Sequence, residues 1–309
     1  MPRNRPLEVI VARSAGTCFG VEAAIDMAER EKKPILGPLV HNPLVVANLA
    51  AAGIPILERY QDLDTLAGQV EEVVITAHGY PKQLKAALQE RGITYHDATC
   101  PVLLKWVYSK IERFEEMGYT ILLVGNPNHA EIIASRSYGT HIHVIYSEDD
   151  CDALPPISGP TVALCQTTIA REKFERLVDY LREHRFSDLK AVDTRCKPVK
   201  SQQEAVENLA QWVDAMLIVG GFESSNTTNL ARISERYLPH RTYHIDSAAS
   251  IDPAWFERVN NLGIGAGTST PQHQIQQVER RLEELFPGQI LIHRTARHDD
   301  EAEDASSEI

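Results

Sequence analysis

Residues 216–245 read MLIVGGFESSNTTNLARISERYLPHRTYHI, and this stretch decides the fold class. The apolar run Met216–Val219 predicts a buried strand, and Thr228–Tyr237 has the apolar periodicity of a helix. A second strand, Tyr243–Ile245, follows shortly after the helix. A strand, a helix and another strand in this order predict a βαβ unit, in which the two strands are parallel.

The same alternation continues in both directions along the 309 residues. Further strands are predicted at Leu7–Ala12, Val73–Ala77, Tyr119–Val124, Val162–Cys165 and Leu262–Ala266. Helical patterns separate them, at Val21–Lys32, Pro81–Arg91, Lys105–Met117, Arg171–His184, Ser201–Trp212, Pro253–Asn260 and Pro271–Leu285. We therefore expect an α/β fold with mainly parallel sheets.

The composition narrows the function classes. Hydrophobic residues make up 43% of the chain and charged residues 24%, as in ordinary globular proteins. The formal net charge of -12 argues against a nucleic-acid partner, which would require a basic face. No run is long enough for a membrane span, and the apolar N-terminal run is too short for a signal peptide. We expect a cytoplasmic protein with no membrane partner, in which the five cysteines stay reduced.

Three of the cysteines lie between a predicted strand and the next helix: Cys18, Cys100 and Cys196. Their spacing predicts three similar modules: residues 1–100 with Cys18 and the Cys100 turn, 101–195, and 196–290. Residues 291–309 would form a C-terminal tail with a disordered acidic end. Spacing alone leaves open whether the three cysteines share a metal or are separate core residues, the reading that suits Cys151 and Cys165.

Histidines in three further loops favour an anion site. His41, His78 and His129 each follow an apolar run, and imidazole donates hydrogen bonds in either protonation state. Glu131, two residues after His129, is a candidate proton donor, although taken alone it could equally be a solvated carboxylate.

Hydroxyl and amide groups cluster at three predicted strand ends: Gln166-Thr167-Thr168, Ser224-Ser225-Asn226-Thr227-Thr228-Asn229 and Gly267-Thr268-Ser269-Thr270-Pro271. Each cluster could be a helix N-cap, and capping is compatible with a cradle for phosphate oxygens. Nucleotide cofactors are not expected, because the glycines of Gly263–Gly267 lack the GxGxxG spacing and no P-loop pattern occurs.

With these motifs in place, the chain resembles the 4-hydroxy-3-methylbut-2-enyl diphosphate reductases of the non-mevalonate isoprenoid pathway. The resemblance extends in order from about Val9 to Leu285. The matching segments are Gly16–Val21, Val40–Asn42, Ala77–Gly79, Asp97–Pro101, Asn128–Glu131, Gln166–Thr168, Asp193–Cys196, Ser224–Asn226 and Ala266–Pro271.

The resemblance implies a trefoil of three α/β modules around a central [4Fe–4S] cluster. Cys18, Cys100 and Cys196 would be the three cysteine ligands, leaving one open iron for the substrate hydroxyl. Thr168 and the proton donor Glu131 would be catalytic. Substrate would be bound by His41, His78, His129, Thr168, Ser224, Ser225, Asn226 and Ser269. Two electrons, from a donor such as a ferredoxin or flavodoxin, would remove the allylic hydroxyl and give isopentenyl and dimethylallyl diphosphate.

Three positions depart from the family pattern. Thr17 stands where an aromatic residue is usual, Ala23 where an arginine is common, and Asn126 where a second histidine is common. A divergent paralogue acting on another allylic diphosphate is therefore one alternative. Others are a non-catalytic iron–sulfur redox or sensor protein, and a hydrolase or transferase with a cysteine nucleophile.

Overall fold

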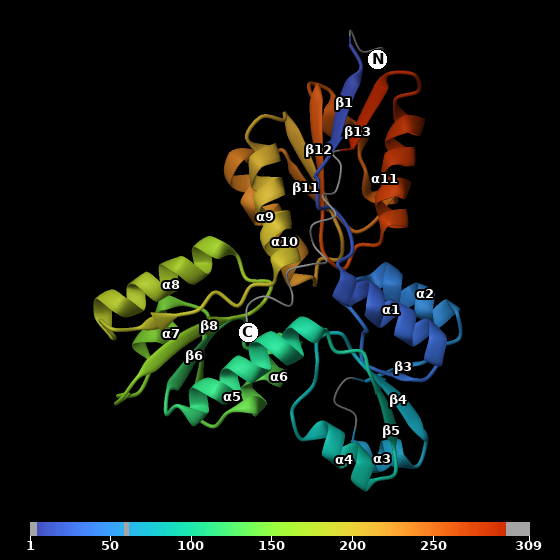
Figure 1. Ribbon diagram of the computed structural model, residues 1–309. Coiled ribbons are helices and arrows are strands. Elements are labelled where there is room, and N and C mark those ends of the chain that lie inside the picture. The colour runs from blue at the N-terminus through green and yellow to red at the C-terminus, as the bar shows by residue number, and fades with distance from the viewer. Residues whose placement is uncertain (1–4, 59–61, 295–309) are drawn as a thin grey trace. The chain divides into compact units, whose positions relative to one another are not determined.

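The computed structural model describes residues 5–58 and 62–294 (Figure 1). The chain divides into two compact units, each with its own sheets and core. One unit is Thr17–Val199; the other, which we call the terminal unit, combines Met1–Gly16 with Lys200–Ile309. The strands of the described residues form three sheets, and all their pairings are parallel. The predicted α/β class with mainly parallel sheets is thus confirmed.

The first sheet of the 17–199 unit has the order β3-β2-β4-β5. Its strands are β2 (Ile35–Leu36), β3 (Ile56–Leu57), β4 (Glu72–Ile75) and β5 (Thr94–Asp97). The helices of this segment are α1 (Phe19–Glu31), α2 (Pro43–Ala51), α3 (Leu63–Ala67) and α4 (Leu84–Glu90).

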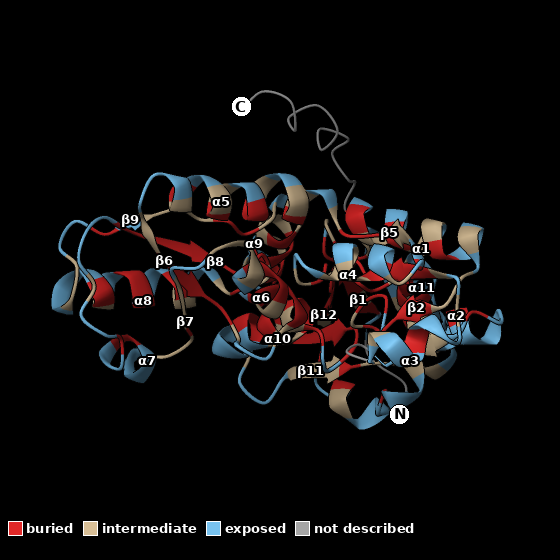
Figure 2. Ribbon diagram, turned by 90° about the horizontal axis from the view of Figure 1, so that it is seen from below, coloured by how far each residue is buried: buried red, intermediate tan, exposed pale blue. Residues whose placement is uncertain are grey.

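The second sheet of this unit has the order β7-β6-β8-β9. Its strands are β6 (Thr120–Val124), β7 (Ile142–Ile145), β8 (Thr161–Cys165) and β9 (Lys190–Ala191). The accompanying helices are η1 (Leu103–Tyr108, a π-helix), α5 (Ser109–Glu116), α6 (Ala130–Ser135), η2 (Arg136–Tyr138), α7 (Glu148–Asp152) and α8 (Arg171–His184). Figure 2 shows α5 and α8 with buried inner faces and exposed outer faces, as expected for amphipathic helices covering a sheet.

The terminal unit holds a five-stranded sheet with the order β11-β10-β12-β1-β13. Its strands are β1 (Leu7–Val11), β10 (Ala215–Val219), β11 (Thr242–Ile245), β12 (Asn261–Ala266) and β13 (Ile290–Arg294). Its helices are α9 (Lys197–Ala210, which crosses the unit boundary), α10 (Ser225–Tyr237), η3 (Ala248–Ser250), η4 (Pro253–Phe256) and α11 (Gln272–Leu285).

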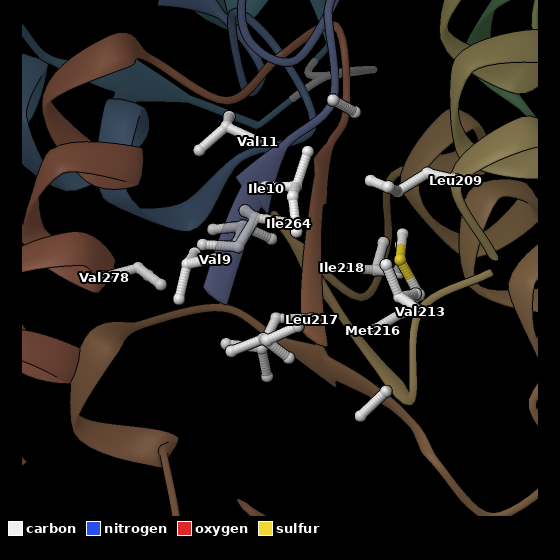
Figure 3. Packing of buried hydrophobic residues seen from close by; sticks show 14 of the residues in the cluster. Val9, Ile10, Val11, Leu209, Val213, Met216, Leu217, Ile218, Ile264 and Val278 are labelled. Atoms are coloured by element: carbon white, nitrogen blue, oxygen red, sulfur yellow. The ribbon is translucent and has the colours of Figure 1, made fainter. Parts of the chain in front are cut away.

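Apolar side chains on both faces of this sheet form its core (Figure 3). Fully buried parallel strands require near-continuous apolar runs, and β10 is buried throughout. Helix α9 packs closely on one face, because a Cβ at Gly263 or Gly265 would lie 3.0 Å or less from side chains of Leu209 or Val206. Glycine in the middle of β12 therefore makes room for the helix.

All three sheets share one strand order. In each sheet the second strand lies at the edge and is followed by the first, the third and a fourth, and β1 takes the fourth place in the terminal unit. The chain leaves the first and third strands in opposite directions, and parallel sheets bind ligands at this point. The loops concerned follow β2 and β4, β6 and β8, and β10 and β12.

The sheet of the terminal unit combines strands from both ends of the described chain. Strand β1, which the sequence assigns to the first module, pairs with β12 and β13 of the last sheet. Strand β13 (Ile290–Arg294) extends from the last residue assigned to the third module into the first residues assigned to the tail, while the predicted disordered end lies outside the described residues. The local sequence of β1 does not indicate that its partner strands lie more than 200 residues away in the chain. The module boundaries at 100, 195 and 290 stay predictions.

Within residues 5–58 and 62–294, we find no helix with both the length and the apolar character needed to cross a membrane.

Candidate functional site

Three cysteines of the 17–199 unit lie at helix starts. Cys18 is the N-cap of α1, Cys100 lies just before η1, and Cys196 immediately precedes α9. Each sulfur accepts hydrogen bonds from backbone N–H groups of the following turn: Gly20 and Val21 for Cys18, Val102 and Leu103 for Cys100, and Val199 for Cys196. Such N–H groups favour negative charge on sulfur.

Burial acts in the opposite direction. It raises the pKa of the Cys18 thiol to about 11, and it also raises the pKa values of Cys100 and Cys196. Negative charge on Cys100 further raises the pKa of Cys18. The pKa of Cys196 is raised in the same way by Cys18, Cys100 and Glu131. The three thiols and Glu131 are therefore near enough to interact, in a region where negative charge is costly.

The backbone links two of these cysteines to neighbouring ligand loops. Cys100 N–H donates to the Ala77 carbonyl, at 3.0 Å, and Cys196 N–H donates to the Thr167 carbonyl, at 3.2 Å. The loop after β4 carries His78, and the loop after β8 carries Thr168. Each cysteine is thus fixed beside the loop of the adjacent strand.

Gly20 makes room for Cys100. A Cβ at Gly20 would lie 2.6 Å from the Cys100 Sγ, which is closer than such atoms approach in folded proteins. Helix α1 can therefore bring Cys18 toward Cys100 only with glycine here. In the described part of the chain, no group of three or more His, Cys, Asp or Glu side chains is placed to hold one metal ion.

The three predicted histidines form a cluster. The ring centroids of His41 and His78 are 4.0 Å apart in a stacked arrangement, those of His41 and His129 are 5.1 Å apart, and those of His78 and His129 are 6.0 Å apart. They come from the loops after β2, β4 and β6, which belong to two different sheets. A cluster of three imidazoles offers several hydrogen-bond donors to one anion.

His129 also caps α6. Its Nδ1 accepts a hydrogen bond from the Glu131 backbone N–H at 3.2 Å. Because Nδ1 accepts, the neutral ring carries its proton on Nε2, where it can be donated. The cap joins the histidine cluster directly to the residue that bears the candidate acid.

The carboxyl group of Glu131 is enclosed within the 17–199 unit. The residue is 3% exposed, and its oxygens accept hydrogen bonds from the backbone N–H of Thr167 at 2.6 Å and from its hydroxyl at 2.7 Å. Burial raises the pKa of Glu131 to about 7, although these two hydrogen bonds oppose the shift. A carboxyl with this pKa can hold a proton near neutral pH and still release it.

Thr168 lies beside this pair, and its hydroxyl accepts a hydrogen bond from the Gln166 side chain at 2.8 Å. The sequence singles out Thr168, but the structure adds Thr167 as the partner of Glu131. Gln166 is also part of the framework, since its Oε1 accepts from the Asn126 N–H at 3.1 Å. The sequence cluster Gln166-Thr167-Thr168 indicated that all three residues could belong to the site. The contacts that each one makes could be learned only from the structure.

The remaining predicted residues lie in the terminal unit. Ser224 is the N-cap of α10, and Ser225 and Asn226 are its first residues, after β10, while Ser269 follows the adjacent β12. The Asn226 side chain donates to Gln202 at 2.6 Å, and Gln202 donates to the carbonyls of Ser14 and Gly16. Gln202, missed by the sequence reasoning, thus orients Asn226.

The predicted site residues form two groups. One group, with the cysteines, the histidines, Glu131 and Thr168, lies in the 17–199 unit, and the other, Ser224, Ser225, Asn226 and Ser269, lies in the terminal unit. Within each group the residues occupy corresponding loops of their sheets. Their individual roles stay predictions.

Comparison with known proteins points to one family. The family described as LytB protein matches residues 9–283. A 4-hydroxy-3-methylbut-2-enyl diphosphate reductase of Aquifex aeolicus is 37% identical over 92% of this chain and 99% of its own. The enzyme of the same name from Alkaliphilus oremlandii is 34% identical over 90% of this chain and 100% of its own.

Two solved structures are similar. One is described as (E)-4-hydroxy-3-methyl-but-2-enyl diphosphate reductase, the terminal enzyme of the non-mevalonate pathway. It is 34% identical, covering 90% of this chain and 99% of its own, with a TM-score of 0.63. The E-1-hydroxy-2-methyl-but-2-enyl-4-diphosphate reductase of Plasmodium falciparum has a TM-score of 0.85 over 96% of this chain and 94% of its own. At 22% identity it supports the fold alone.

Proposed function

Because the chain belongs to the LytB family, we propose that it catalyses the reductive dehydroxylation of 4-hydroxy-3-methylbut-2-enyl diphosphate. The reaction consumes two electrons and two protons. The allylic C–O bond breaks, the oxygen leaves as water with one proton, and the second proton is added to the allylic carbon skeleton. The products are isopentenyl and dimethylallyl diphosphate.

The donor set of the three cysteines fits a [4Fe–4S] cluster with one open iron. Thiolates are the usual ligands of such clusters, and these three sulfurs are buried near one another with backbone N–H donors. Without a cation, burial keeps the thiols protonated, and bound iron would favour the thiolates. When bound, the cluster would supply electrons and a Lewis-acidic iron that makes the hydroxyl a better leaving group.

The histidine cluster would bind the diphosphate. The ring centroids of His41, His78 and His129 lie 4.0–6.0 Å from one another, so the three imidazoles form one cluster of potential donors to an anion. Partly enclosed imidazoles bind phosphate oxygens more strongly than solvated ones would. Hydroxyl and amide groups of the terminal unit are proposed as further diphosphate ligands, on residue type and motif order: Ser224, Ser225, Asn226 and Ser269.

Glu131 would be the proton source. Its carboxyl is neutral up to about pH 7, and Thr167 fixes both of its oxygens. Thr168, on the next residue, would orient the substrate hydroxyl. The cap of α6 is the observation that carries the proposal, because it joins His129, the proposed anion ligand, directly to Glu131, the proposed acid.

Anaerobic turnover with an artificial reductant tests this function. We expect the hydroxylated diphosphate to be converted to the two isoprenoid diphosphates, and the protein to give the visible and electron paramagnetic resonance spectra of an iron–sulfur cluster. A colourless, iron-free protein with full activity would disprove the cluster.

The same assay separates the alternatives. A cluster without turnover would indicate a redox or sensor protein, and turnover only of a related allylic diphosphate would indicate a divergent paralogue. We further propose a cytoplasmic location and a small redox protein, such as a ferredoxin or flavodoxin, as electron donor.

A further inference from the structure

Tyr108 is a buried residue of the 17–199 unit that the proposed mechanism does not use. It ends the π-helix η1, which begins three residues after Cys100, and it is 2% exposed. Its ring stacks on that of Tyr138, with centroids 3.9 Å apart and an interplanar angle of 13°. A π-helix turns side chains away from their α-helical directions and often marks a functional site.

The Tyr108 hydroxyl lies against Gly79, in the loop that carries His78. A Cβ on Gly79 would be only 2.3 Å from the Tyr108 Oη, so the hydroxyl fills the space beside this glycine. Gly79 has a φ of 74° and immediately follows His78. Electrostatic interaction also links the phenol to Glu131 and Cys100. The hydroxyl therefore lies next to the residue after His78 and interacts electrostatically with two further residues of the candidate site.

Among the described residues, the Tyr108 hydroxyl has no hydrogen-bond partner. A buried polar group without a hydrogen bond is costly, and such groups are rare in native structures. Phenylalanine would fill the same volume without that cost. Burial also raises the pKa of the phenol above its usual range, so at neutral pH the group is a donor.

We propose that Tyr108 is a further substrate-binding residue, whose hydroxyl donates a hydrogen bond to an oxygen of the diphosphate held by the histidine cluster. The proposal rests on the function proposed above. The fold would keep an unsatisfied donor because the ligand satisfies it, which is how functional sites depart from the most stable sequence. The stack on Tyr138 holds the ring in place before the ligand arrives.

The test compares Tyr108→Phe with Tyr138→Phe. Both variants keep the stacked rings, but Tyr138→Phe removes a hydroxyl from the partly exposed member of the pair. Holoprotein prepared anaerobically is titrated with inorganic diphosphate by calorimetry, and its thermal unfolding is followed separately. We expect Tyr108→Phe to raise the Kd for diphosphate about tenfold and to raise the Tm by about 2–4 °C. Tyr138→Phe should leave both unchanged.

Each other outcome overturns the proposal. Equal diphosphate affinity in Tyr108→Phe and wild type would mean that the hydroxyl serves another acceptor, such as water. Weaker binding together with a lower Tm would mean that the hydroxyl only supports the fold. Failure of the wild type itself to bind diphosphate would remove the proposed function as well, so the two failures are distinguishable.

Discussion

Glu131 is the residue on which the proposed chemistry most depends. In Glu131→Gln, the amide can keep both contacts with Thr167 but cannot deliver a proton. We expect turnover to fall by about 10²–10⁴-fold while the cluster spectrum is unchanged. Glu115→Gln is the matched control, since Glu115 also accepts from the N–H and hydroxyl of one threonine, Thr140. Unchanged turnover in Glu131→Gln would remove this residue from the mechanism.

The raised pKa of Glu131 predicts the pH dependence of the same step. Only the protonated carboxyl donates, and burial moves its pKa up to about 7. The acid is therefore present below that pH and is lost as the pH rises through it. We expect kcat to fall about tenfold per pH unit on the alkaline side, measured over about three pH units centred near 7. A rate that rises with pH through this range would contradict the assignment.

At the residue scale, motif order predicted which side chains to examine, but it could not predict their partners. The contact of Glu131 with Thr167, rather than Thr168, depends on how β8 ends. Two departures from the family pattern have local roles. Asn126 accepts from the Asn128 N–H in the loop before His129, and the Thr17 hydroxyl donates to Glu22 on α1. Ala23 is exposed, and nothing in the structure explains it.

At the element scale, helix α1 packs closely against Cys100, and we expect this packing to require glycine at position 20. Alanine normally favours a helix, but in Gly20→Ala the new Cβ would meet the Cys100 Sγ at 2.6 Å. We expect iron content to fall and stability to drop by about 1–3 kcal/mol. The control is Gly68→Ala at the end of α3, where the nearest atom would be 3.7 Å away. Equal iron in both variants would show that Cys100 can move aside.

His129 has two roles that substitutions can separate: it caps helix α6, and it contributes an imidazole to the histidine cluster. His129→Asn should preserve the start of the helix, because asparagine is a good N-cap, but it removes one imidazole from the cluster. His129→Ala removes both, with a further stability loss of about 1 kcal/mol. We expect both variants to bind inorganic diphosphate more weakly, and only the alanine variant to unfold at lower temperature. Normal diphosphate affinity in His129→Asn would exclude the ring from the anion site.

The long apolar strands and amphipathic helices could be predicted because their periodicity is strong. The strand predicted at Leu7–Ala12 is β1, and the helix predicted at Arg171–His184 is α8. The short strands β2, β3 and β9 were missed, since two residues carry no periodicity. Strands β5, β7 and β13 were missed as well, because each mixes apolar with polar or charged residues. The helix predicted at Pro253–Asn260 was wrong, since only the 3-10 turn Pro253–Phe256 forms there before β12 begins at Asn261. The π-helical turn of η1 was also missed, because an apolar helical pattern does not distinguish a π-helix from an α-helix.

At the scale of the whole molecule, the shared strand order explains why three distant cysteines are equivalent. Each follows the fourth strand of a sheet: Cys100 follows β5, Cys196 follows β9, and Cys18 follows β1. The sequence shows no repeat from which this order could be read. The third sheet differs from the other two because its fourth strand, β1, comes from the N-terminal end of the chain.

Strand β1 is therefore expected to be essential to the terminal unit and not to the 17–199 unit. Strand β1 pairs with β12 on one side and with β13 on the other, and Leu7 and Val9 are fully buried between them. Without residues 1–11, β13 loses the strand it pairs with, β12 keeps only β10, and the core loses the buried side chains of β1.

We therefore expect a variant without residues 1–11 to lose amide hydrogen-exchange protection in β12 and β13, while β6 and β8 stay protected. Strands β6 and β8 belong to the sheet of the 17–199 unit, which contains no N-terminal strand, and so they serve as an internal control. A synthetic peptide of residues 5–16 should restore protection, because parallel pairing needs the strand itself and not its covalent link. Protection of β12 in the truncated protein would mean that the sheet closes without β1, and loss in β6 and β8 as well would mean that the two units do not fold separately.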